Sequence, residues 1–105
     1  MSFKAFFQWA RNDLIESRTF QALGERAQFQ AQYKQDSNEM EITNSKGNVG
    51  HLRKMHLERI FERYFALPHA QRHKAKYYED PEWAETPNRV FAPAVPAIIR
   101  YWIER

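Results

Sequence analysis

The spacing of apolar residues changes twice along this 105-residue chain, and those changes limit the folds that it can adopt. From Phe3 to Leu14 apolar residues recur every three or four positions, which predicts an amphipathic helix capped by Ser2. From Ala27 they alternate with polar residues, which is the period of a half-buried strand. Helical spacing returns after Met55. Strands and helices that are segregated along the chain in this way indicate an α+β domain.

The alternating segment predicts a small antiparallel β-meander. Apolar and polar residues alternate on both sides of the turn-forming stretch 36–38, so the sequence predicts a β-hairpin over residues 27–44. A second turn around Gly47 allows residues 49–52 to return as a third strand. Residues 19–23 are a candidate edge strand. We therefore expect two to four strands.

Two further helices are predicted on either side of a proline-rich stretch. Residues 54–66 and 95–104 each carry an amphipathic stripe of apolar residues. Residues 68–96 contain all five prolines of the chain, and we expect them to wrap the core as an irregular segment. The expected anchors of that segment are Tyr77, Tyr78, Trp83, Val90 and Phe91.

Residues 1–105 are expected to form one domain, because the chain is short and 43% of its residues are hydrophobic. The predicted fold is α+β: an N-terminal helix, the meander, a central helix, a proline-rich wrap and a C-terminal helix. Each element presents one apolar face, and these faces are expected to meet in a single core. The predicted core residues are Ile42, Leu57, Ile60, Phe61, Ile98, Ile99 and Trp102.

Composition excludes several classes of protein. The chain has no cysteine, so it cannot form disulfides, thiolate metal sites or a cysteine nucleophile. It has no run of about 20 apolar residues, which argues against a membrane partner. Lys4 and Gln8 interrupt the first residues, which therefore do not resemble a signal peptide. We expect the protein to reside in the cytoplasm.

Positive charge is concentrated in the middle of the chain. Residues 46–76 hold eight Lys or Arg and two Glu, although the whole chain has a net charge of only +3. Lysine and arginine contact the phosphates of nucleic acids. The candidate residues for binding nucleic acid or another anion are Lys46, Arg53, Lys54, Arg59, Arg63, Arg72, Lys74 and Lys76.

The arrangement of these cations after folding decides whether they form one surface. Arg59 and Arg63 lie four residues apart on the polar side of the central helix, so we expect them to be exposed together. Residues 72–76 would join them if the chain folded back along that helix. Four acidic residues between 79 and 85 follow directly, so a charged face neutralised by a neighbouring loop is the alternative interpretation.

The sequence contains no catalytic signature. His69 and His73 have the four-residue spacing of a helical metal site, with Glu79, Asp80 or His56 as further ligands, but no His-Glu-x-x-His pattern accompanies them. We therefore predict no metal, no cofactor and no catalytic residue. His51 completes the four histidines, all of which lie in the basic segment.

Two functions of different classes remain open. The leading hypothesis is a non-enzymatic binding module that acts through residues 46–76 on nucleic acid or on an acidic protein. The alternative is a small metal-independent RNase of the toxin type, in which His56, His69 or His73 transfers protons while Arg or Lys stabilises phosphate. A homodimer is also expected, because Trp9 lies about a third of a turn from the apolar stripe of its helix. Burial of Trp9 under the proline-rich segment is the other interpretation.

Overall fold

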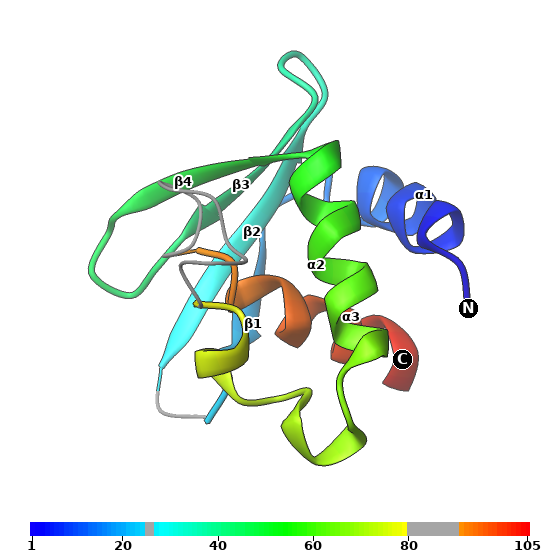
Figure 1. Ribbon diagram of the computed structural model, residues 1–105. Coiled ribbons are helices and arrows are strands. Elements are labelled where there is room, and N and C mark those ends of the chain that lie inside the picture. Colours follow the sequence, from blue (N-terminus) through cyan, green and yellow to red (C-terminus); the bar gives the residue numbers. More distant parts are fainter. Residues whose placement is uncertain (25–26, 80–90) are drawn as a thin grey trace.

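The computed structural model describes residues 1–24, 27–79 and 91–105, and it has the predicted α+β architecture (Figure 1). The helices are α1 (Phe3–Asp13), α2 (Lys54–Ala66) and α3 (Ala94–Glu104). The strands are β1 (Arg18–Gln21), β2 (Gln28–Lys34), β3 (Glu39–Thr43) and β4 (Val49–Arg53). Two single turns of 3₁₀ helix, η1 (His69–Gln71) and η2 (Ala75–Tyr77), follow α2.

The four strands form one antiparallel meander in the order β1-β2-β3-β4. The hairpin predicted over residues 27–44 is β2 and β3, and the two candidate outer strands are both present. Burial alternates along every strand, so only one face of the sheet is covered. The three α-helices lie on that covered side (Figure 1). The molecule is therefore a two-layer domain with one open sheet face.

The predicted core is confirmed. All seven predicted residues are buried in one cluster, together with the inward side chains of the sheet. Phe6 of α1 lies between α2 and α3, because its ring is 5.5 Å from Phe61 and 5.4 Å from Trp102. Phe7 meets the sheet through Tyr33, at 5.7 Å between ring centroids.

The N-terminal helix forms as predicted, since Ser2 Oγ accepts the N–H of Ala5 at 3.2 Å. Trp9 is buried, and its ring centroid lies 5.9 Å from that of Tyr101 in α3. Arg105 lies over the same indole, 5.8 Å from the centroid. Trp9 therefore packs within the chain against α3 and gives no support for a dimer interface.

The proline-rich wrap is described only at its two ends. Tyr78 is fully buried and Tyr77 and Phe91 are partly buried, as expected of anchors, while Trp83 and Val90 lie outside the described residues. Phe91 packs on the inward face of the sheet at Gly50, which has no side chain to oppose it. The segment after α2 folds back along that helix, and this determines where several of the predicted site residues lie.

Candidate anion-binding surface

The eight predicted cations divide into two groups. Arg63 and Arg72 are half-buried, and the other six are exposed. The exposed cations are Lys46, Arg53, Lys54, Arg59, Lys74 and Lys76. They follow the chain from the β3–β4 turn across β4 and α2 to the segment beyond α2, so they form an extended series rather than one compact cluster.

Lys46 stands apart from the rest. It lies in the β3–β4 turn, where Asn44 Oδ1 accepts the backbone N–H of Lys46 at 3.0 Å and that of Asn48 at 2.9 Å. Gly47 has a φ of +83°, a conformation that side chains disfavour. This turn lies at the opposite end of β4 from α2 (Figure 1). The length of β4, about 13 Å at the usual rise per residue, separates Lys46 from Arg53.

The start of α2 concentrates positive charge. Arg53 is the N-cap residue, Lys54 opens the helix, and the first turn contains no acidic residue. The N-terminal end of a helix is itself electropositive, so cations there are unfavourable for the folded chain and favourable for an anion. The arginine side chain cannot accept a hydrogen bond. His56 Nδ1 instead accepts the Arg53 N–H at 3.3 Å.

An open hollow lies beside this turn. Its lining residues are Ser37, Asn38, Arg53, Lys54, Met55 and Glu58. Lys54 Nζ is turned toward α1, 5.2 Å from the ring centroid of Phe7. Arg11 Cζ lies 5.7 Å from the same centroid. Arg11, which lies outside the predicted segment, therefore adds its charge to this end of the molecule.

The expectation that Arg59 and Arg63 are exposed together is wrong for Arg63. Arg59 is exposed, whereas Arg63 is half-buried and its Nε donates to the carbonyl of Tyr77 at 3.0 Å. The cause is the segment that follows α2. It folds back along the helix and places η2, which contains Tyr77, against the side of α2. Arg63 holds that segment in place, so its role in the structure is packing as well as charge.

Arg72 is also part of the fold. Its Nε donates to the carbonyl of Leu67 at 3.2 Å, and Nη2 lies 3.5 Å from the carbonyl of Phe65. Its guanidinium carbon is 5.5 Å from the ring centroid of Tyr64. A cation is favoured at these carbonyls, because the C-terminal end of a helix is electronegative. Arg72 therefore closes α2, while the neighbouring Lys74 and Lys76 remain exposed.

The four histidines are not brought together. His51 lies on the open sheet face, 3.4 Å from a carboxylate oxygen of Glu41, and His56 caps α2. His69 and His73 follow α2, and His73 Nε2 is 2.9 Å from the hydroxyl of Tyr64. Burial, followed by the charges of Arg100 and His69, lowers the pKa of His73. Burial raises the pKa of Tyr64.

No arrangement that could hold a metal ion is present among residues 1–24, 27–79 and 91–105. His69 and His73 lack a third ligand within this part of the chain, and Asp80 falls outside it.

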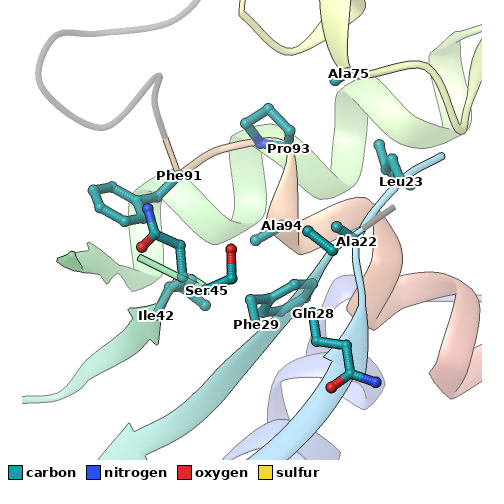
Figure 2. A pocket seen from close by; sticks show the side chains of 12 residues that line it. Ala22, Leu23, Gln28, Phe29, Ile42, Ser45, Ala75, Phe91, Pro93 and Ala94 are labelled. Carbon is teal, nitrogen blue, oxygen red and sulfur yellow. The ribbon is translucent and has the colours of Figure 1, made fainter. Parts of the chain in front are cut away.

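The pocket in Figure 2 is apolar and about 200 Å³ in volume. It lies between the inward face of the sheet and the start of α3, where Phe29, Phe91 and Pro93 converge. None of the described residues that line it is acidic, basic or a histidine. The pocket therefore has no side chain suited to acid–base chemistry, and it does not coincide with any predicted site residue.

The open face of the sheet is polar and lacks stacking platforms. Gln28, Gln30 and Gln32 alternate outward along β2, beside Glu41 of β3. No outward position of the four strands holds a phenylalanine, tyrosine or tryptophan. Stacking of bases on aromatic rings is thus unsupported on this face.

Within the part of the chain that the structure describes, no helix has the length and apolar character needed to cross a membrane. Comparisons with protein-family models, with curated proteins and with solved structures found no match.

Proposed function

We propose that the protein is a non-enzymatic module that binds nucleic acid through the exposed cations of residues 46–76. The observation that supports this is the extended series of exposed lysines and arginines. Among the described residues, five of these six side chains form no ion pair with a carboxylate; they are Lys46, Arg53, Lys54, Lys74 and Lys76.

A phosphate backbone suits this arrangement better than a compact ligand does. The cations lie at the two ends of β4, on α2 and beyond it, on a molecule that measures 33 × 32 × 25 Å. A nucleic acid presents regularly spaced phosphates over such a distance. Of the aromatic rings near the series, Phe7 and Tyr64 are buried, and the half-buried ring of Tyr77 already has Lys76 Nζ 5.1 Å from its centroid. We therefore expect contact with phosphates and little reading of base sequence.

Salt dependence is the signature of such binding. Each phosphate that is neutralised releases counterions, so the logarithm of the binding constant falls linearly with the logarithm of salt concentration. If all six exposed cations contacted B-form DNA, the slope would be about −5. If only the cations of α2 and of the segment after it contacted phosphates, the dependence of the binding constant on salt would be less steep.

The test is fluorescence anisotropy with labelled single-stranded RNA, single-stranded DNA and duplex DNA at several salt concentrations. A variant with Arg53→Gln and Lys74→Gln should bind more weakly, and its salt slope should be smaller by about 2. The matched control, Lys4→Gln with Arg105→Gln, removes the same charge outside residues 46–76 and should bind as the parent does.

Two results would overturn the proposal. Absence of binding by the parent protein at low salt would leave an acidic protein as the better partner. Degradation of the RNA, abolished by replacing one of His56, His69 or His73, would favour the RNase alternative.

A further inference from the structure

The first strand, β1, lies at one edge of the sheet and pairs on its inner side with β2. The N–H of Ala22 donates to the carbonyl of Ala27 at 2.9 Å, which continues the ladder of these two strands. Backbone groups in an antiparallel pair alternate between the two sides of a strand. Phe20 and Ala22 therefore direct their N–H and C=O groups to β2, whereas Thr19 and Gln21 direct theirs away from the sheet.

These outward backbone groups are available for pairing. Among the residues that the structure describes, no hydrogen bond involves the N–H or C=O of Thr19 or Gln21. Proteins commonly protect such an edge with an outward charge, a proline or a bulge. Residues 19–23 contain no charged residue and no proline. Arg18 precedes them, but its Nη1 donates to the hydroxyl of Tyr101 at 2.8 Å.

A hollow of about 310 Å³ runs along this edge, between β1 and α3. Five consecutive residues, 19–23, line its strand side. Its helix side is lined by Ala97, Arg100, Tyr101 and Glu104. Positions at these intervals share one face of a helix. The free strand edge and one face of α3 thus form a single elongated surface.

The charges on that face of α3 are self-complementary. Arg100 Nε lies 3.3 Å from Glu104 Oε1, and both side chains are exposed. A twofold contact brings the same surface of two subunits together, so each residue of one copy meets a different residue of the other. Two copies of α3 in antiparallel orientation can therefore place Arg100 of each opposite Glu104 of the other.

The strand edge and the helix face share one centre. Phe20 lies between Thr19 and Gln21 in β1, and its ring centroid is 5.3 Å from that of Tyr101. Tyr101 in turn lies between the two charged positions of α3. A single twofold axis near these two rings can therefore relate both the strand edges and the helix faces. Tyr101 is 40% exposed, so it offers apolar surface for such a contact to cover.

We propose that a second copy of this chain docks on this surface, with the β1 strands of the two copies paired antiparallel. Thr19 of each copy exchanges two hydrogen bonds with Gln21 of the other, and the two Phe20 residues lie opposite one another. The two four-stranded sheets join into one continuous sheet. The proposal does not depend on nucleic-acid binding, because none of the cations of residues 46–76 lines the hollow.

Sedimentation equilibrium from micromolar to millimolar protein measures the association. We expect the mass to rise from the 12.7 kDa of the monomer toward twice that value. Amide hydrogen exchange, followed by NMR at low and high protein concentration, locates the contact. The amides of Thr19 and Gln21 should become protected as the dimer forms, whereas that of Phe20, which is directed to β2, should be equally protected at both concentrations.

Two results of these measurements would overturn the proposal. A monomer at every concentration would leave an extended segment of another protein as the better occupant of the edge. A dimer in which the amides of Thr19 and Gln21 still exchange freely would place the contact elsewhere.

The double variant Thr19→Lys with Gln21→Lys tests the strand edge. It places lysines directly opposite one another in the paired strands, where like charges are unfavourable. We expect the dissociation constant of the dimer to rise by at least about tenfold. The matched control, Gln28→Lys with Gln30→Lys, makes the same change of charge at exposed positions of β2 and should leave the dimer intact. Equal weakening by both variants would contradict pairing through β1.

Charge reversal tests the contact between the α3 helices. Glu104→Lys and Arg100→Glu each give this face of α3 charges of one sign, so each variant alone should remain monomeric. Mixed in equal amounts, the two variants should form a heterodimer, because opposite charges then meet across the axis. Single variants that associate as the parent does, or a mixture that stays monomeric, would refute the proposed contact.

Discussion

The ring of Phe91 lies against the backbone of Gly50, in the space that a Cβ at that position would occupy. Gly50 is inside β4 and opposite Ile42, a place where glycine normally weakens a strand. Its presence is explained by the close approach of Phe91, which brings the residues before α3 down onto the sheet.

Gly50→Ala should therefore destabilise the protein, although alanine is ordinarily the better residue in a strand interior. We expect a loss of about 1–3 kcal/mol in the free energy of unfolding, because the new methyl group forces Phe91 to move. Urea denaturation measures this, with Val49→Ala at an exposed neighbouring position as the control. A variant as stable as the parent would show that Phe91 does not occupy this place.

Truncation of Phe61 tests the core. Its ring contacts Phe3, Phe6, Phe65 and Trp102, so Phe61→Ala removes packing between all three helices. We expect a loss of about 3–5 kcal/mol, a large fraction of the roughly 5–15 kcal/mol that stabilises a domain of this size. Met55→Ala on the exposed side of the same helix should change the stability by less than about 0.5 kcal/mol. Similar effects of the two changes would mean that α2 buries a different face.

Stability should depend on pH through His73. Its pKa is lowered in the folded protein, chiefly by burial, whereas the unfolded chain titrates near the usual value of about 6.5. As pH falls from about 6.5 toward the lowered pKa, the unfolded state binds the proton first and stability declines; above about 6.5 this contribution is complete. Urea denaturation between pH 5 and 7, in a buffer without phosphate, should show a smaller decline for His73→Gln. Parallel curves for the two proteins would contradict the prediction.

Arg72 and Lys74 should behave differently despite their proximity. Arg72→Gln removes charged hydrogen bonds to the carbonyls that end α2, so it should lower stability by about 1 kcal/mol. Lys74→Gln removes an exposed charge and should weaken nucleic-acid binding while stability stays the same. Anisotropy and denaturation on both variants measure the contrast. If Lys74→Gln were the more destabilising change, the two roles would be assigned the wrong way round.

Most of the fold could be predicted because each element buries one face, and burial determines the apolar period. Leu57, Ile60 and Phe61 share one side of α2, and the strand pairs around residue 37 alternate as a half-covered sheet requires. The sequence predicts only that the number of strands lies between two and four, since short edge strands such as β1 carry few alternating positions.

The candidate site was less predictable, because it depends on contacts between distant segments. The residues around Arg63 in the sequence do not indicate that the chain folds back and that the carbonyl of Tyr77 accepts a hydrogen bond from Arg63. Arg11 has no distinguishing neighbours in the sequence, and it joins Lys54 beside the ring of Phe7 only when α1 packs against the start of α2. Charge clustering along the chain identified the basic segment, but it could not separate structural arginines from exposed ones.

The packing of α3 also has a consequence for the order of events during synthesis. The meander pairs neighbouring strands, so its hydrogen bonds form between residues that leave the ribosome together. The helix that completes the core, α3, is distant in sequence from its partners. Arg18 of β1 donates to the hydroxyl of Tyr101 in α3, and Phe6 of α1 packs against Trp102 in α3. The part of the sheet's apolar face that α3 covers therefore stays exposed until α3 emerges, although α1 already packs on the sheet through Phe7 and Tyr33. Ribosome-bound chains that stop before residue 94 should be cleaved readily by protease, and resistance in such chains would show that α1 and α2 suffice to close the core.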